Sequence, residues 1–398
     1  MTQIQNLIGT EICGTRMSRQ ELTKYLSLKK KKKLPQILTI NAYSAQECST
    51  GQNAKVAVIN SGCCTSHPDL ESCLEKDTHK HGRNLLVCKS IDPNDPQDSY
   101  KKYLLADNAS HGTAIAGVIN SIAPKARQYI FKVVRTSKPD TLELRPVIRA
   151  LGFAIHPVFD CDIINLSLVI DEDPELKRIC DALAYEEGKL LVAAAGNTCV
   201  GPVFPAAWES VISVGSVNTK KSHSLFSNID RTVDVCAPGE DIFSLDVPQW
   251  TEKIISAITF QKIDQYKKAY SLNSGTSFAA PHVAGVLALG TSLLKEKGYK
   301  IGKDISTKQV KEILCKTAYR PNIDIEKIRK SLSKEIREEI QKKSAGEETE
   351  KFEKFLTPAD LTYALSRIED IPAEELYHQA FGSGIVEANE FLKEIAKL

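Results

Sequence analysis

The sequence is expected to contain no apolar run of the length needed to span a membrane, and it lacks the pattern of a secretory signal peptide. Its first twenty residues carry charged and polar side chains where a signal peptide has its apolar core. These two absences argue against a membrane partner and predict a cytoplasmic protein.

A strong excess of charge of either sign is also absent. The 398 residues include 52 lysines and arginines against 50 aspartates and glutamates, which gives a formal net charge of +2. The one basic run, residues 29–33, has no arginine or aromatic residue interleaved with it, and we interpret it as a solvated linker. The composition therefore gives no reason to expect nucleic acid as a partner.

Cysteine is present, but not in the arrangements that bind metals or build a disulfide framework. The 11 cysteines are an odd number, and they include no pair at Cys-x-x-Cys spacing and no adjacent histidine-rich cluster. We therefore expect reduced thiols, as in the cytosol, and neither a metal nor another cofactor.

The sequence does contain a regular alternation of short β-branched runs and longer helical segments. Expected strands cover residues 55–59, 129–134, 162–168, 190–195 and 211–217, and expected helices cover 114–119, 144–155, 174–187 and 306–317. Alternation of this kind implies βαβ crossovers. The predicted fold is α/β with three layers, in which a mostly parallel central sheet has helices on both faces. In such a sheet the chemistry lies at the carboxyl ends of the strands.

A further apolar helix begins at a glycine-threonine-serine turn. Gly275 allows a sharp bend, and the helix behind it directs unpaired N–H groups and the positive end of its dipole toward Ser277. This geometry suits a nucleophile whose attack on a carbonyl creates an oxyanion. A serine that merely caps a buried helix has the same local sequence, so other residues must decide between the two roles.

Three polar residues at strand ends or helix starts match the other roles that acyl transfer requires. His111 opens an apolar helix and is the candidate base for Ser277. Asn197 follows the strand at 190–195 and is the candidate oxyanion donor. Asn60 follows the strand at 55–59 and is the candidate group that orients the histidine.

The motifs around these residues resemble those of subtilisin-like serine peptidases, the subtilase family, and most closely the intracellular subtilisins. The resemblance runs from about residue 54 to residue 392. It rests on residues 56–70, 111–113, 165–168, 194–197, 275–282 and 381–388. It implies a serine endopeptidase that acts on a peptide or protein substrate through an acyl-enzyme at Ser277, with His111 as base and Asn197 in the oxyanion hole.

Asn60 is the main departure from this family. The resemblance places it where subtilases have their catalytic aspartate, and the downstream residues 67–70 are in register. An amide oxygen can accept the histidine N–H but carries no charge, and a flipped amide would hold the wrong tautomer. In serine proteases, subtilisin among them, loss or amidation of this aspartate costs roughly 10⁴-fold in rate. We therefore expect reduced activity.

The resemblance also assigns the substrate-binding residues. These are Ser167, Leu168, Val169, Ala195, Gly196 and Val203. Val169 stands where a substrate-facing glycine is usual, and Val203 lies near the expected floor of the specificity pocket. The added methyl groups are expected to narrow the cleft, so that it favours small side chains or is obstructed.

Asp69 matches one ligand of the calcium site of the family. The loop that presents the other ligands is shortened here to residues 120–123, and calcium needs six or more oxygen ligands. The sequence therefore argues against calcium as a cofactor.

The resemblance, together with the shift in composition near residue 324, implies an N-terminal extension (1–50), a subtilisin-like peptidase domain (51–320), a charged helical insertion (321–372) and a closing segment (373–398). Apolar residues at helical spacing predict an amphipathic helix in the insertion, which docks on the main body or on an unknown partner. They are Ile325, Ile328, Leu332, Ile336 and Ile340. Residues 344–351 are predicted to form a mobile, charged loop.

Two functions remain open from the sequence. The first is a serine endopeptidase of reduced activity. The alternative is a catalytically impaired pseudoprotease that binds a peptide or protein partner in the intact cleft. The presence of Ser277, His111 and Asn197 together favours the enzyme, because binding alone gives no chemical reason for all three.

Overall fold

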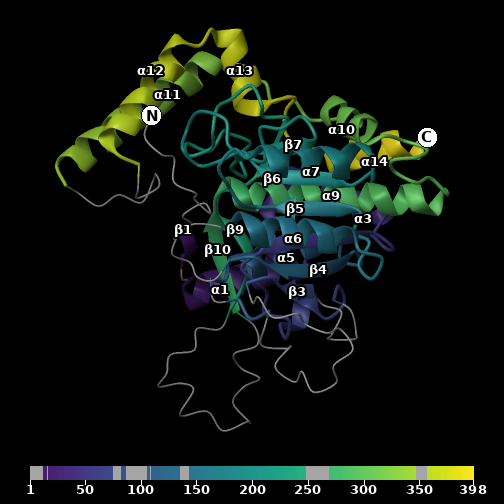
Figure 1. Cartoon of the computed structure of the whole chain (residues 1–398). Helices are drawn as coiled ribbons and strands as arrows, with labels where there is room; N and C mark the ends of the chain where they lie inside the picture. The colour runs from purple at the N-terminus through teal and green to yellow at the C-terminus, as the bar shows by residue number, and fades with distance from the viewer. Residues whose placement is uncertain are drawn as a thin grey trace.

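The central sheet is parallel throughout. The computed structural model describes residues 12–15, 17–74, 82–86, 105–107, 109–134, 143–247, 269–346 and 356–398. Within them the seven sheet strands, from edge to edge, are β3 (Gly82–Asn84), β4 (Arg127–Lys132), β2 (Lys55–Asn60), β5 (Ile163–Leu166), β6 (Leu190–Ala194), β7 (Val211–Val217) and β8 (Val235–Pro238) (Figure 1). The parallel pairing confirms the expectation of βαβ crossovers.

Alternate side chains of the strands enter two cores, one on each face of the sheet. In β2, Val56 and Val58 belong to the core that contains α5 (His111–Ile122) and α9 (Thr276–Glu296). Ala57 and Ile59 belong to the core that contains α6 (Leu144–Ile155) and α7 (Pro174–Tyr185). All four β2 side chains are fully buried, as expected for a strand covered on both faces. This confirms the predicted three-layer α/β fold.

Helix α9 is the central helix of the larger core. With 21 residues it is long and apolar enough to cross a membrane, so the expectation that no run reaches that length was wrong. However, 94% of its most apolar window is buried inside the protein. The apolar composition of α9 is therefore explained by its place in the core.

A second, antiparallel sheet leads into α9 and was not predicted. It consists of β1 (Ile12–Thr15), β10 (Ala269–Ser274) and β9 (Ile242–Asp246), in that order. The inward-facing residues of β10 include Ser271 and Asn273, which are polar, so the strand has no apolar alternation to detect. β8 was missed as well.

The N-terminal region contributes three helices to the main body. They are α1 (Arg19–Lys30), α2 (Pro35–Thr39) and α3 (Ala42–Cys48). Ile37 and Ala45 are fully buried in the same core as α9. The prediction of a solvated linker at 29–33 was wrong at its start, because Lys29 and Lys30 form the last turn of α1.

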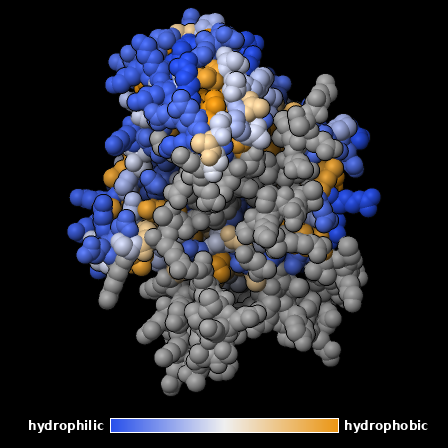
Figure 2. Space-filling view, turned by 90° about the vertical axis from the view of Figure 1, so that its left-hand side faces the viewer, coloured by the Kyte–Doolittle hydropathy of each residue, from blue (hydrophilic) through white to orange (hydrophobic). Residues whose placement is uncertain are grey.

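The C-terminal region is helical. Its helices are α10 (Thr307–Lys316), α11 (Ile325–Ser344), α12 (Pro358–Asp370), α13 (Ala373–Phe381) and α14 (Ala388–Ala396). In α11, Leu332 and Ile336 are buried and the other stripe residues are partly buried against the same core, so the predicted stripe docks within the chain. α11 and α12 lie side by side above the sheet (Figure 1), and hydrophobic side chains remain visible among hydrophilic ones on this upper part (Figure 2).

Two other expectations concern residues 344–351 and the division into domains. The predicted loop at 344–351 falls mostly outside the described residues, because only 344–346 belong to them, and they form the end of α11 and a turn. The four-part domain division stays a prediction.

Two buried histidines predict a loss of stability in acid. Burial lowers the pKa of His223 and of His282 to about 4. In the unfolded chain a histidine titrates near pH ~6.5, so between these values only the unfolded state binds the proton. We expect the free energy of unfolding to fall by roughly 1.4 kcal/mol per pH unit for each histidine as pH falls from about 6.5 to about 4.

Urea unfolding at several pH values in this range measures that slope. A His223→Leu variant removes one of the two titrating groups, so its slope should be smaller by about one proton's contribution. A slope identical to that of the wild type would contradict the prediction.

Candidate active site

The predicted catalytic residues lie at one edge of the sheet. Asn60 is the last residue of β2, His111 the first residue of α5 and Ser277 the second residue of α9. Asn197 follows the end of β6. By this edge we mean the side of the sheet at which the parallel strands have their carboxyl ends, not an outermost strand. It lies next to β9 and β10 in Figure 1.

The structure brings Asn60 and His111 into direct contact. The distance from Asn60 Oδ1 to His111 Nδ1 is 2.7 Å, and both residues are buried. The same Oδ1 accepts a hydrogen bond of 2.8 Å from the Ser61 N–H, and Asn60 Nδ2 donates to the Ser167 carbonyl at 3.3 Å. Each end of the amide therefore has a partner that fits only this orientation.

This orientation decides the tautomer of the histidine. Because Asn60 presents an oxygen to His111 Nδ1, that nitrogen must carry the hydrogen. The lone pair of a neutral imidazole is then on Nε2, which is the nitrogen that a general base uses. A flipped amide would set its NH₂ group against the Ser61 N–H, so the wrong tautomer is disfavoured.

Asn197 is oriented in the same way. Its Oδ1 accepts hydrogen bonds from the backbone N–H and the hydroxyl of Thr276, both at 2.8 Å. The NH₂ group of Asn197 therefore points away from Thr276. A β-carbon added to Gly275, whose φ is +146°, would lie 3.1 Å from Ser277 Oγ and 3.4 Å from Asn197 Nδ2. The hydroxyl and the amide donor thus border one small space, which a side chain at position 275 would fill.

The Ser277 hydroxyl is buried and forms no hydrogen bond with the described residues. The His111 ring packs edge-to-face on Phe278, with 5.2 Å between ring centroids. The Ser277 carbonyl accepts a hydrogen bond of 2.7 Å from Ser167 Oγ, which in turn accepts one of 2.9 Å from Asn165 Nδ2. The candidate nucleophile Ser277 and its candidate base His111 therefore make no hydrogen bond with each other in this structure.

The predicted substrate-binding residues follow β5 and β6. Ser167, Leu168 and Ala195 are buried, whereas Val169 and Val203 are partly exposed. Val203 packs against the loop that follows β6, because a β-carbon on Gly196 would lie 3.0 Å from Val203 Cγ1. The Ile170 N–H donates to the Phe204 carbonyl at 2.9 Å, which joins the segment after β5 to the segment that holds Val203.

Sequence reasoning missed the residues that orient these side chains. Thr276 holds Asn197, Ser61 holds Asn60, and Asn165 supports Ser167. Each is a short polar residue next to, or two positions from, a predicted one. Their position was the only available signal, because a hydroxyl or amide in a buried strand end must find a partner.

Asp69 is bonded to protein groups. Its carboxylate forms an ion pair with Lys29 and accepts a hydrogen bond of 2.8 Å from the Tyr270 hydroxyl. Burial alone would raise the pKa of Asp69, but Lys29 and Tyr270 lower it below its ordinary value. No group of three or more potential metal ligands occurs among the described residues.

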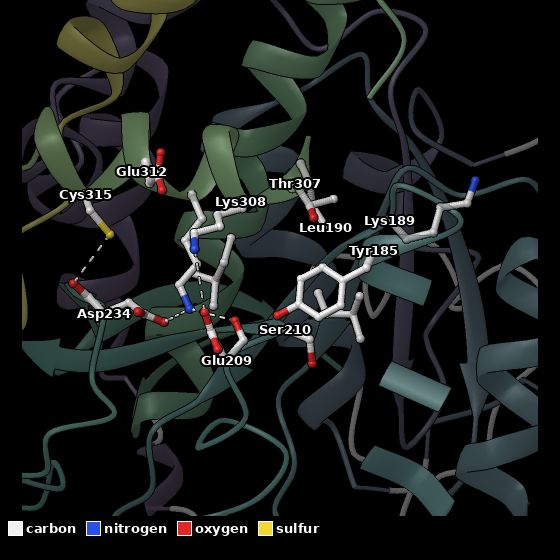
Figure 3. A pocket seen from close by; sticks show the side chains of 13 residues that line it. Tyr185, Lys189, Leu190, Glu209, Ser210, Asp234, Thr307, Lys308, Glu312 and Cys315 are labelled. Carbon is white, nitrogen blue, oxygen red and sulfur yellow. Dashed lines mark hydrogen bonds and ion pairs between the residues drawn. The ribbon is translucent and has the colours of Figure 1, made fainter. Parts of the chain in front are cut away.

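A cavity of about 310 Å³ lies at the opposite edge of the sheet (Figure 3). Its floor includes Leu190 and Ile212, near the amino ends of β6 and β7, and α10 contributes Lys311. The amine of Lys311 is bonded to Asp234 at 2.8 Å. The cavity contains none of the predicted site residues.

Comparisons with known proteins identify the family of the chain. A model of the subtilase family (peptidase S8) matches residues 51–353. The chain belongs to the subtilase family. It is 34% identical over 262 residues to the major intracellular serine protease of Bacillus subtilis strain 168, an alignment that covers 62% of this chain and 70% of the relative.

Other relatives have similar levels of identity. The intracellular serine protease of Paenibacillus polymyxa is 34% identical, with 63% of this chain and 70% of the relative covered. Subtilisin E of Bacillus subtilis is 34% identical, with 60% and 56% covered. The crystal structure of a lanthipeptide protease shares the fold with a TM-score of 0.62 at 23% identity, over 94% of this chain and 96% of that one. By class, the protein is a subtilisin-like serine endopeptidase.

The contacts of Asp69 predict that stability depends on Lys29 and not on calcium. EDTA should leave the melting temperature unchanged, whereas Lys29→Met should lower the free energy of unfolding by about 1 kcal/mol, because the ion pair is partly exposed. Thermal unfolding measures both effects, and Lys30→Met, at the exposed neighbouring position, is the matched control. A fall of several degrees on adding EDTA would show that a metal is bound.

Proposed function

We propose that the protein hydrolyses peptide bonds through an acyl-enzyme at Ser277, with His111 as the general base. Asn60 would stand in the position of the triad aspartate, and Asn197 would donate to the oxyanion. The observation that carries this proposal is the contact of 2.7 Å between Asn60 Oδ1 and His111 Nδ1. It supports the tautomer that a base requires.

The proposed reaction follows from these positions. Ser277 Oγ attacks the substrate carbonyl carbon, and its proton passes to His111 Nε2. The hydrogen on Nδ1 stays there, hydrogen-bonded to Asn60 Oδ1. Asn197 Nδ2, whose oxygen is held by Thr276, donates to the developing oxyanion. His111 then returns the proton to the leaving amine, and water releases the acyl group by the reverse sequence.

The rate is expected to be reduced. Asn60 orients His111 but carries no negative charge to stabilise the imidazolium that forms when Ser277 is deprotonated. Relative to an enzyme with aspartate at this position, orientation is retained and charge is lost. The proposed activity is therefore slow proteolysis.

The substrate class follows from the cleft. Val203, packed against Gly196, supports a shallow pocket for the residue before the cleaved bond, so small side chains would fit best. The similarity to relatives named intracellular serine proteases supports a cytoplasmic location and cytoplasmic peptides or proteins as substrates.

A pseudoprotease that holds a peptide without cleaving it is the second candidate. It is supported by the Ser277 hydroxyl, which forms no hydrogen bond with the described residues. The enzyme is favoured because catalytic hydrogen bonds often tighten only when substrate is bound. Both functions use the same cleft, so only a chemical test of Ser277 separates them.

Chemical labelling of Ser277, with and without a negative charge introduced at position 60, provides that test. A fluorophosphonate probe should label Ser277 slowly in the wild type and not at all in Ser277→Ala. In Asn60→Asp, labelling and peptidase activity should rise by about 10²- to 10⁴-fold, because the nearly isosteric replacement adds the missing charge. A folded Asn60→Asp protein with no labelling and no turnover would support the pseudoprotease.

The pocket proposal predicts a change in specificity. Val203→Gly should raise kcat/KM for peptides with a large apolar residue before the cleaved bond by about 10-fold or more, relative to peptides with alanine there, because the removed methyl groups deepen the pocket. Val158→Gly, at an exposed position, is the control. An unchanged ratio of the two kcat/KM values would place the pocket floor elsewhere.

A further inference from the structure

A second buried carboxylate lies at the start of the histidine helix. Asp107 is 5% exposed and accepts four hydrogen bonds. Its Oδ1 accepts from Ser61 Oγ at 2.8 Å and from the Ala109 N–H at 3.0 Å. Its Oδ2 accepts from the N–H and the hydroxyl of Thr113, at 2.8 and 2.7 Å. These contacts cap the first turn of α5, in which His111 is the first residue.

Ser61 connects this carboxylate to the catalytic histidine by two routes. The N–H of Ser61 donates a hydrogen bond to Asn60 Oδ1. The same oxygen accepts the hydrogen bond from His111 Nδ1. The hydroxyl of Ser61, which donates to Asp107, accepts a hydrogen bond of 3.0 Å from the N–H of Gly112, the residue after His111. Both Asn60 and the backbone next to His111 are therefore hydrogen-bonded to Ser61, and Ser61 is hydrogen-bonded to the carboxylate of Asp107.

We propose that Asp107 is a positioning residue that supplies, through Ser61, the negative charge that Asn60 lacks. This inference rests on the proposed function. When Ser277 transfers its proton to His111 Nε2, an imidazolium forms at the N-terminus of α5, where the positive end of the helix dipole opposes it. A buried carboxylate beside the same turn offsets this cost. No proton moves to Asp107, because the Nδ1 hydrogen stays on His111.

Other charged groups face the same helix end. The amine of Lys132 donates to the Ala106 carbonyl, one residue before Asp107, and reduces the field of the carboxylate. Asp246, on β9, accepts a hydrogen bond from the hydroxyl of Ser110, the cap residue of α5, and adds to the negative charge. The nearby Cys63 is a neutral thiol, because burial raises its pKa. Asp107 is the carboxylate bonded to Ser61.

A double-mutant cycle separates this role from a purely structural one. Asp107→Asn should lower the rate of Ser277 labelling and kcat/KM by about 10-fold or more in the wild-type background. In the Asn60→Asp background the loss should be about 3-fold or less, because position 60 then supplies the charge directly. If Asp107 only caps α5, the loss is the same in both backgrounds, and the inference is overturned.

The pH profile is a second readout. Removal of the Asp107 charge makes the imidazolium harder to form, so the acidic limb of the labelling rate should move to lower pH in the wild-type background and stay in place with Asn60→Asp. Asp324→Asn, which changes a cap of α11 in the same way, is the matched control and should alter neither readout. An acidic limb that does not move in Asp107→Asn contradicts the proposal.

The remaining outcomes are also decisive. If Asp107→Asn does not fold, Ser61→Ala replaces it, since it removes the hydroxyl that links Asp107 to Gly112 and should show the same dependence on background. If Ser277 is labelled but Asp107→Asn lowers the labelling rate equally in both backgrounds, the inference is overturned and the proposed function stays intact. No labelling in either the wild type or Asn60→Asp overturns both.

Discussion

The orientation of two side-chain amides is the constraint on which the rest of the site depends. Asn60 and Asn197 each have an oxygen and a nitrogen of nearly the same shape, and the proposed roles need the oxygen of one and the nitrogen of the other. Ser61 and Thr276 fix both choices by donating to the oxygens. Because these contacts are buried, a flipped amide would leave donors facing donors, which costs more than the hydrogen bond itself.

The sheet supplies the positions of these amides. Asn60 ends β2, and Asn197 follows β6 after a glycine. Both residues are therefore positioned by strands whose side chains are buried on both faces of the sheet. The two helices that begin at the same edge add His111 and Ser277. A site assembled from four element ends needs little support from long loops, and its geometry depends on the register of the strands.

The sequence predicted the central sheet well because its strands are apolar runs with helical segments between them. β2, β6 and β7 and helices α6 and α7 lie within two residues of their expected bounds. It failed for β10, where the inward-facing residues Ser271 and Asn273 are polar, and for Lys29, whose partner Asp69 is 40 residues away. The candidate site residues were predicted from their places at strand ends and helix starts and from motifs that resemble the subtilase family. The partners that orient them depend on contacts that only the folded chain makes.

The way the first residues are tied to the last part of the fold has a consequence for synthesis. Gln36 donates to the Phe243 carbonyl, 207 residues later, and Ser49 to the Leu289 carbonyl, 240 residues later. β1 pairs with β10, which leads to Ser277. A ribosome delivers the chain from its N-terminus, so these two contacts and the pairing of β1 with β10 can form only after more than half of the chain has been made. The site is therefore completed late, and the growing chain carries no assembled hydrolytic centre while it is still unfolded and easily cut.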